Sequence, residues 1–269
     1  MRRPTWVPAG TDVETPNAAR VYDYYLGGSH NFEADRDLAR QAMALWPDLP
    51  VIMRANRAFL RRAVQHLAAL GITRFLDIGS GIPTFGAVHE VARATRPQAR
   101  VVYVDLDPIA VAHSRLLLQD DPLSATVMAD MTDTGDLLSR PEVTALLAPG
   151  EPVAVLLLAM LHFVTDAEDP AKIVGALRDA VPSGSHLVLT HASRESRPEQ
   201  ADSLAELYAR RTTTPLVMRG REAVRAFFDG WDLLPPGVVW LPEWRPEDPE
   251  SVDSHPERIS GLAAVGRRP

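Results

Sequence analysis

The sequence predicts an α/β fold, a mostly parallel sheet with helices on both faces, on the basis of three observations. Between residues 72 and 191, short runs rich in Val, Leu and Ile alternate with stretches of helical character, as in successive β-α-β units. Most of these runs are continuously apolar, which is typical of strands covered on both faces. The pairs Asp107-Pro108 and Asp169-Pro170 each place a capping acid before a first-turn proline, and so predict the starts of two crossover helices.

Three helices are expected ahead of the first strand. The first begins at Thr15-Pro16, where a capping residue precedes a proline, and ends at the glycines at 27–28. We expect the three helices to form a lid, residues 1–70, beside a cofactor-binding domain of residues 71–269. Their predicted bounds are 15–28, 33–46 and 50–71.

The strands are predicted from the apolar runs between turn residues. Beyond His191 the pattern changes to two helices, a strand, a loop rich in proline and acidic residues, and a last strand, which we expect to close the sheet as an antiparallel pair. The expected strands cover residues 74–78, 100–105, 125–129, 153–159, 186–191, 232–241 and 260–266, and the two late helices cover residues 198–211 and 221–228.

Composition and charge exclude several classes of protein. The chain carries 28 basic and 35 acidic side chains, a formal charge of −7, without a basic segment, so nucleic acid is not expected as a partner. It has no cysteine, which excludes disulfides and thiolate catalysis, and no cluster of His and acidic residues has metal-ligand spacing, so no metal is expected. The longest apolar run, residues 153–161, is far shorter than the roughly 20 residues that cross a bilayer. We therefore expect a cytoplasmic protein without a membrane segment.

The strongest local signal is the end of the first predicted strand, where Asp77 is followed by Gly79, Ser80 and Gly81. Glycines in a strand-to-helix turn let a ligand approach the backbone. A dinucleotide site would have a third glycine where Thr84 stands, and Asp77 would lie near the pyrophosphate. Two like charges about 4 Å apart repel by roughly 4 kcal/mol at an effective dielectric of about 20. S-adenosylmethionine carries a sulfonium and an ammonium instead, so the charge of Asp77 favours this cofactor.

Two further acids follow the second and third predicted strands. Asp105, with Leu106 after it, can accept hydrogen bonds from both hydroxyls of a ribose, which dinucleotides and S-adenosylmethionine share. Asp130 can accept from an adenine amino group while the backbone at Met131 meets the ring. Each acid alone could equally be a turn residue or a helix cap. Together at the carboxyl ends of three strands, where α/β sheets bind ligands, they predict a nucleotide-type pocket.

On these motifs the chain resembles the Rossmann-like class I S-adenosylmethionine-dependent methyltransferases. It further resembles a family common in actinobacteria, formerly catalogued as a domain of unknown function. The resemblance covers nearly the whole chain and implies a seven-stranded sheet whose last strand is antiparallel, with S-adenosylmethionine as cofactor and no agreed acceptor. Tyr25 and Ala263-Ala264 depart mildly from the family pattern, outside the cofactor motifs. The matching residues are 76–81, 104–105 and 129–130 for the class, and 19–28, 31–32, 34–36, 81–84, 161–164 and 265–267 for the family.

Methyl transfer depends mainly on aligning the acceptor with the carbon–sulfur bond, which can contribute roughly 7–11 kcal/mol. A general base is needed only if the acceptor is a hydroxyl or a protonated amine. His162, just after the fourth predicted strand, is then the candidate base, although it could instead shape the loop by hydrogen bonds. Ala159, at the end of that strand, is assigned to the cofactor site, and His191 is a second candidate histidine.

The lid is expected to cover this site. Tyr22, Tyr25 or an arginine such as Arg57 could meet the cofactor's carboxylate or the acceptor, while the two tyrosines could equally be core residues. Arg57 recurs with Arg54 and Arg61 at helical spacing, which fits either a solvated face or an anion site.

The leading hypothesis is a methyltransferase whose lid encloses a small-molecule acceptor. The alternative from another class is a protein that binds S-adenosylmethionine or S-adenosylhomocysteine and regulates a partner without catalysis. A nicotinamide-dependent dehydrogenase is a third hypothesis, against which Thr84 and Asp77 argue.

Overall fold

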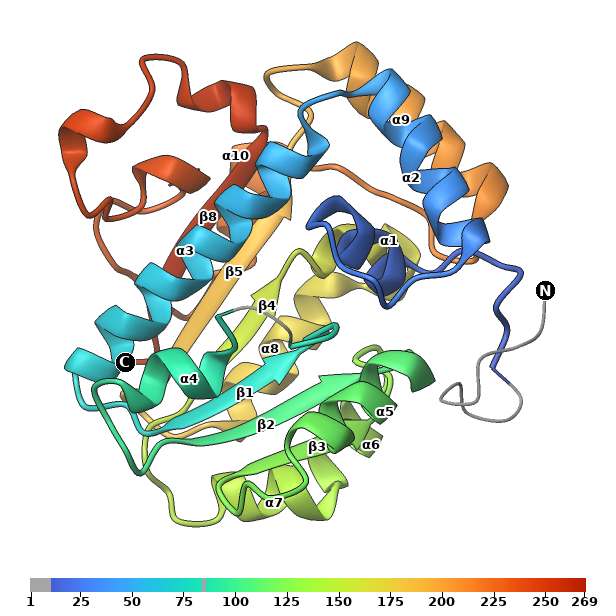
Figure 1. Cartoon of the computed structure of the whole chain (residues 1–269). Coiled ribbons are helices and arrows are strands. Elements are labelled where there is room, and N and C mark those ends of the chain that lie inside the picture. Colours follow the sequence, from blue (N-terminus) through green and yellow to red (C-terminus); the bar gives the residue numbers. More distant parts are fainter. Residues whose placement is uncertain (1–10, 84–85) are drawn as a thin grey trace.

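A computed structural model describes residues 11–83 and 86–269, and its centre is a mixed sheet of eight strands (Figure 1). The strands are β1 (Arg74–Ile78), β2 (Arg100–Asp105), β3 (Ser124–Met128), β4 (Ala154–Leu158), β5 (His186–Ala192), β6 (Asp232–Leu233), β7 (Val239–Trp240) and β8 (Gly261–Arg267). Their order is β3-β2-β1-β4-β5-β8-β6, with β7 also paired to β8. Strands β1 to β5 pair in parallel, whereas β8 is antiparallel to its neighbours. The predicted fold, with its antiparallel last strand, is confirmed.

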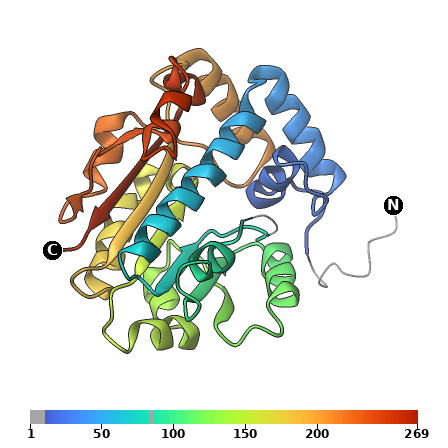
Figure 2. The same ribbon diagram turned by 60° about the vertical axis from the view of Figure 1, so that its left-hand side comes forward.

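Helices cover both faces of the sheet, as Figures 1 and 2 show from two directions. Helices α3 and α4 pack on one face, and α6, α7, α8 and α10 pack on the other. The helix bounds are α1 (Ala18–Tyr25), α2 (Glu33–Leu45), α3 (Leu49–Ala69), α4 (Val88–Arg93), α5 (Pro108–Leu117), α6 (Thr134–Ser139), α7 (Pro141–Leu147), α8 (Pro170–Ala180), α9 (Pro198–Arg211) and α10 (Arg221–Ala226). Among the described residues, none of these helices combines the length and apolar character that a membrane crossing requires.

Side chains alternate along each parallel strand between the two cores. In β4, Ala154, Leu156 and Leu158 face the core under α3, whereas Val155 and Leu157 face the core under α8. All five are buried. The run is continuously apolar because both faces of a parallel strand are covered, as the sequence predicts.

A group of helices covers one end of the sheet. Helices α1, α2 and α9 and the first turns of α3 share a separate apolar core, and we call this group the cover. Figure 1 shows α2 and α9 side by side, although they lie far apart in the sequence. The remainder of α3 packs on the sheet, so this helix belongs to both layers.

Two predicted elements are wrong in their bounds. The first helix begins at Ala18 rather than at Thr15-Pro16, because Asn17 caps it: the Asn17 side-chain oxygen accepts from the Ala19 amide at 2.8 Å. The expected strand over residues 232–241 is divided into the two short strands β6 and β7. The segment between them contains Pro235-Pro236, and prolines have no N–H to donate to a ladder.

The two predicted crossover helices begin where expected. The Asp107 carboxylate accepts from the Ile109 amide at the start of α5, and Asp169 accepts from the Lys172 amide at the start of α8. Thr84, the residue at the third glycine position of a dinucleotide motif, lies outside the described residues.

Candidate functional site

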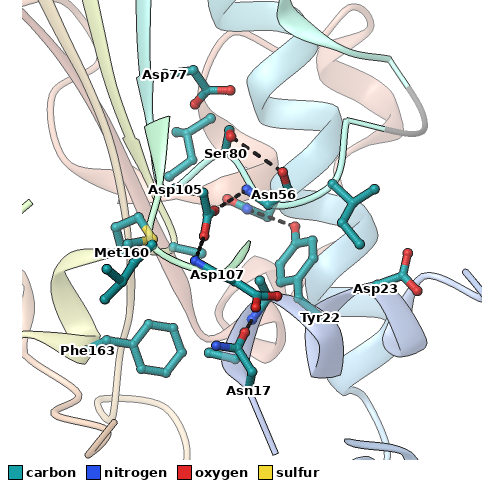
Figure 3. A pocket seen from close by; sticks show the side chains of 18 of the residues that line it. Asn17, Tyr22, Asp23, Asn56, Asp77, Ser80, Asp105, Asp107, Met160 and Phe163 are labelled. Carbon is teal, nitrogen blue, oxygen red and sulfur yellow. Dashed lines mark hydrogen bonds between the residues drawn. The ribbon is translucent and has the colours of Figure 1, made fainter. Parts of the chain in front are cut away.

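A cavity of about 180 Å³ lies where the cover meets the carboxyl ends of β1, β2 and β4 (Figure 3). We call it the first cavity. On the side of the sheet, the turn after β1 and the ends of β2 and β4 line this cavity. On the side of the cover, α1 and α3 line it. Of the residues predicted to bind the cofactor, those that line it are Asp77, Gly79, Ser80, Gly81, Asp105, Leu106, Ala159 and Tyr22.

The turn after β1 requires glycine at two positions, for different reasons. Gly79 and Gly81 have φ angles of 72° and 61°, in the region that favours glycine. A Cβ on Gly79 would lie 2.0 Å from the Met160 sulfur, whereas a Cβ on Gly81 would meet no atom within 4 Å. The backbone at Gly81 therefore borders open space, and a ligand can approach it closely.

Asp105 connects this turn to the start of α5. Its carboxylate accepts from the Gly81 amide at 2.7 Å and from the Asp107 amide at 2.8 Å, one bond to each oxygen (Figure 3). Burial raises the pKa of Asp105 to about 6, although these two amides favour the charged form. Each oxygen keeps a second lone pair, so the pair of oxygens can still accept from a diol.

Asp77 lies deeper in the same cavity and is 5% exposed. Burial raises its pKa to about 7, the nearby Arg57 guanidinium opposes this rise, and the Asp105 carboxylate adds to it. A carboxyl group with such a pKa ionises fully when a cation is placed beside it. The site therefore offers a buried negative charge to a cationic ligand.

Tyr22 attaches the cover to the sheet through a chain of hydrogen bonds. The amide of Ala159 donates to the Thr190 hydroxyl at 2.8 Å, and that hydroxyl donates to Asn56 Oδ1 at 2.7 Å. Asn56 Nδ2 then donates to the Tyr22 hydroxyl at 3.0 Å, and the hydroxyl donates to the Met53 carbonyl at 3.3 Å. The chain joins the end of β4 to β5, α3 and α1. It thus fixes α1 above the cavity.

The loop after α1 is organised by Asp23, which also lines the first cavity. Its Oδ2 accepts from the His30 amide and from Asn31 Nδ2, both at 2.8 Å. A Cβ on Gly28 would lie 2.1 Å from Asp23 Oδ1, so a larger residue there would displace the Asp23 carboxylate. Asp23, Asn17 and Asn56 were not predicted to belong to the site. The signal for Asp23 was available, because Asp23, Gly28 and Asn31 all belong to the amino-terminal family motif.

Two predicted cofactor residues are not among those that line the first cavity. The Asp130 carboxylate accepts from the amide and the hydroxyl of Thr132, at 2.8 and 2.7 Å. Met131 is buried in the core under α6 and α8. Both residues follow β3, as predicted, but neither lines the cavity.

The arginines of α3 also divide between two environments. Arg57 lines the first cavity, close enough to Asp77 to influence its pKa. Arg61 pairs with Glu247 at 2.6 Å on the surface. The solvated-face interpretation therefore fits Arg61, and the site interpretation fits Arg57.

His162 lines a second, smaller cavity of about 80 Å³ rather than the first. We call it the second cavity; Ala18, Tyr22, Ala159 and Phe163 line both. His162 is 7% exposed, and its Nδ1 accepts from the Ala192 amide at 3.3 Å. Burial, together with the nearby His191 and Arg219, holds the pKa of His162 well below its usual value.

His191 and Arg219 brace the loop that carries His162. Arg219 donates to the carbonyls of Leu161 and Val164, both at 2.9 Å, and contacts His191 Nε2 at 3.2 Å. Burial lowers the pKa of His191 to about 4. His191 is therefore neutral, and its contact with Arg219 supports the structure of the loop.

Comparison with known proteins decides the family. The model of the S-adenosyl methyltransferase family matches residues 4–269. The chain belongs to the S-adenosyl methyltransferase family. It is therefore an S-adenosylmethionine-dependent methyltransferase, which sets aside the dehydrogenase hypothesis. A comparison with curated proteins finds no match.

Two solved structures resemble this methyltransferase over nearly its whole length. A Thermobifida fusca YX protein, provisionally described as a methyltransferase, is 39% identical, with 98% of this chain and 99% of that chain covered and a TM-score of 0.91. A DUF574 family protein from Streptomyces avermitilis MA-4680 is 40% identical, with 96% and 99% covered and a TM-score of 0.91. An O-methyltransferase family protein from Burkholderia thailandensis shares the fold at 12% identity, with 95% and 64% covered and a TM-score of 0.54.

The residues of the first cavity fit the cofactor of this methyltransferase. S-adenosylmethionine has a ribose diol, an ammonium and a sulfonium, and the cavity offers two buried carboxyl groups beside an open glycine turn. A doubly charged pyrophosphate would meet the same carboxyl groups as like charges. Among the residues that the structure describes, no group of three or more His, Asp or Glu side chains is arranged to bind a metal ion.

Proposed function

We propose that this methyltransferase transfers a methyl group to a small molecule enclosed between the sheet and the cover. The observation that carries the proposal is the pair of adjoining cavities, which share Tyr22, Ala159 and Phe163 as lining residues. Their volumes suit a cofactor and a small partner, and of a macromolecule only a single side chain or an extruded base could enter them.

In the proposed complex, the first cavity binds the cofactor. Asp105 accepts from the ribose hydroxyls, Gly79, Ser80 and Gly81 border the ligand with their backbone, and Leu106 lies beside it. Asp77 faces the positively charged amino and sulfonium groups, for which its buried carboxylate supplies the counter-charge. The adenine contacts assigned to Asp130 and Met131 stay a prediction, since neither residue lines the cavity described above.

The chemistry requires alignment and exclusion of water more than it requires proton transfer. When bound, S-adenosylmethionine supplies an electrophilic methyl group: the acceptor's lone pair forms the new bond, and the carbon–sulfur electron pair stays on sulfur as a neutral thioether. Tyr22 and Phe163, at the boundary between the cavities, would align the two reactants and exclude water. Met160 closes the side next to Gly79.

The role of His162 as a general base stays a prediction, and its contacts favour a different use. Because Nδ1 accepts from the Ala192 amide, the ring proton of the neutral histidine is on Nε2. Its lowered pKa keeps the ring neutral at physiological pH. A histidine in this state donates a hydrogen bond through Nε2 and is a weak base, so it would orient the acceptor rather than deprotonate it.

Calorimetric titration with S-adenosylhomocysteine tests the cofactor site. Asp105→Asn removes the negative charge and changes the hydrogen bonding to the ribose, at roughly 1.5–3 kcal/mol per charge-assisted bond, so we expect at least a tenfold loss of affinity. Asp120→Asn is the control, because it removes the same charge from an exposed residue outside the cavity. Full affinity in Asp105→Asn, or an equal loss in both variants, would contradict the placement of the ribose at Asp105.

A transfer assay tests the class of acceptor. The enzyme is incubated with methyl-labelled S-adenosylmethionine and a bacterial extract, which is then separated by ultrafiltration into small molecules and macromolecules. We expect label in the small-molecule fraction, dependent on Asp105. Label found only in protein or nucleic acid would contradict a small-molecule acceptor.

A further inference from the structure

We propose that the second cavity binds the methyl acceptor, and that it selects a neutral, ring-sized apolar group carrying an oxygen or nitrogen that accepts hydrogen bonds. This inference rests on the proposed function, since it places the acceptor beside the cofactor's cavity. It adds the chemical class of the acceptor and the residues that recognise it.

The position of the second cavity suits a reaction partner. Tyr22 and Phe163, which line both cavities, project into the region of the first cavity in Figure 3. Ala159, at the end of β4, is a third shared residue and has a small side chain. Ala18 is the fourth shared residue, so any molecule in the second cavity lies next to a ligand in the first.

The walls of the second cavity are apolar and aromatic. None of the described residues that line it is an Asp, Glu, Lys or Arg. A charged molecule would lose its hydration there without a counter-charge, so the cavity favours a neutral one. Its aromatic side chains, which provide flat apolar surface for a ring, are Tyr22, Tyr25, Trp46, Phe163 and Tyr208.

These walls include a buried hydrogen-bond donor without an acceptor. Trp46 is 2% exposed, and its indole nitrogen has no hydrogen-bond partner among the described residues. The Tyr25 hydroxyl, in contrast, bonds to the Tyr208 hydroxyl, and burial raises the pKa of Tyr25 well above its usual value, so this hydroxyl keeps its proton. A buried donor without a partner forfeits its bond to water, and a ligand with an accepting atom would satisfy that of Trp46.

His162 adds a second donor to the same cavity. With its Nδ1 bonded to the Ala192 amide, the neutral ring presents Nε2–H as its other polar group. The Tyr25 and Tyr208 hydroxyls bond to each other and burial keeps both protonated, which leaves one of their two protons to donate. The cavity thus combines apolar walls with a surplus of donors, which is why the acceptor must bring the accepting atom.

The size of the second cavity limits what enters it. Its volume of about 80 Å³ is roughly half that of an engineered cavity of about 150 Å³ that holds benzene. Met53 and Met218 are part of its lining, and unbranched thioether side chains adapt readily to a ligand. A single ring, or the reactive end of a larger molecule, therefore enters only as these side chains move aside.

Anisole and ethylbenzene form a matched pair of probes, equal in heavy atoms, of which only anisole has an accepting oxygen. Each is titrated into the enzyme saturated with S-adenosylhomocysteine. We expect anisole to bind more tightly than ethylbenzene. In Trp46→Phe, which removes the indole N–H, we expect anisole to bind about fivefold more weakly, whereas ethylbenzene binding changes little.

Trp244→Phe is the control variant, because Trp244 is also fully buried with an unpartnered indole nitrogen but lies in the core under α3. It should leave anisole affinity unchanged. A measurement that needs no variant follows the methionine methyl signals of the native enzyme, where Met53 and Met218 should shift on addition of anisole. If S-adenosylhomocysteine binds while anisole shows no advantage over ethylbenzene, or shifts other methionines only, the inference is overturned. Failure to bind S-adenosylhomocysteine would instead overturn the proposed function.

Discussion

The carboxyl group of Asp77 is unfavourable for the stability of the protein without its cofactor. Its pKa rises to about 7 in the folded state from an ordinary 3.8, because burial penalises the charged form more than Arg57 stabilises it. The folded state therefore binds more protons than the unfolded state between these pH values, and stability falls as pH rises through this window. Asp77 therefore lowers the stability of the protein although it belongs to the lining of the first cavity.

Replacing Asp77 should raise the stability of the protein and lower its affinity for the cofactor. We expect Asp77→Asn to have a higher free energy of unfolding than the native protein at pH 8. At pH 5 this difference in free energy should be smaller, by at most about 3 kcal/mol. Urea denaturation at the two pH values measures this difference. A variant that is less stable than the native protein at pH 8 would contradict the assigned cause of the pKa shift.

The same carboxyl group should make cofactor binding dependent on pH. Below pH 7 Asp77 is largely protonated and loses its attraction for the ammonium and sulfonium groups, so the affinity for S-adenosylmethionine should rise between pH 6 and 7.5. Above about pH 8 the ligand's own amino group begins to lose its charge. Calorimetry should detect proton release near pH 6.5 in the native protein and less in Asp77→Asn, where Asp105 is the one of the two carboxyl groups that remains. Equal release in both would assign the proton to another group.

At the scale of elements, the attachment of α1 depends on Asn56, a buried residue of α3. It accepts from the Thr190 hydroxyl and donates to the Tyr22 hydroxyl, so one side chain joins the sheet to the cover. Asn56→Ala should lower the free energy of unfolding by about 1–3 kcal/mol. It should also raise the KM for S-adenosylmethionine, because α1 is less well fixed.

The control is Arg61→Ala on the same helix, which removes an exposed ion pair with Glu247 and should change stability by less than about 1 kcal/mol. Chemical denaturation of the two variants tests both expectations. An Asn56→Ala variant as stable as Arg61→Ala would show that the hydrogen-bond chain does not fix α1.

Elements with strong local signals were predicted accurately from the sequence. The bounds of β1, β2 and α9 match, because apolar runs end at glycine, proline or acidic turn residues that act locally. The start of α1 was misplaced because Asn17 and Thr15 are both good caps, and only the structure shows which side chain reaches an amide. The glycine turn and Asp105 were found for the same local reason. Asn56 was not, because its role depends on Thr190, which is distant in sequence.

At the scale of the whole molecule, the cover is built from both halves of the chain. Leu38 and Ala42 of α2 share a core with Leu204 and Tyr208 of α9. The sequence predicted both helices but not their packing, because apolar periodicity identifies a buried face without identifying its partner. The second cavity lies among these same helices. Its aromatic lining could not be assembled from motifs that are local in sequence.

The packing of α2 against α9 also affects how the chain folds during its synthesis. At ~5–20 residues per second, α9 leaves the ribosome on the order of ten seconds after α2. Throughout that interval the apolar sides of the amino-terminal helices have no matching surface, so nascent chains are exposed to aggregation or chaperone capture. Strands β1 and β2, which carry Asp77 and Asp105, are synthesised during this interval. These cofactor-binding strands therefore exist before α9 completes the cover.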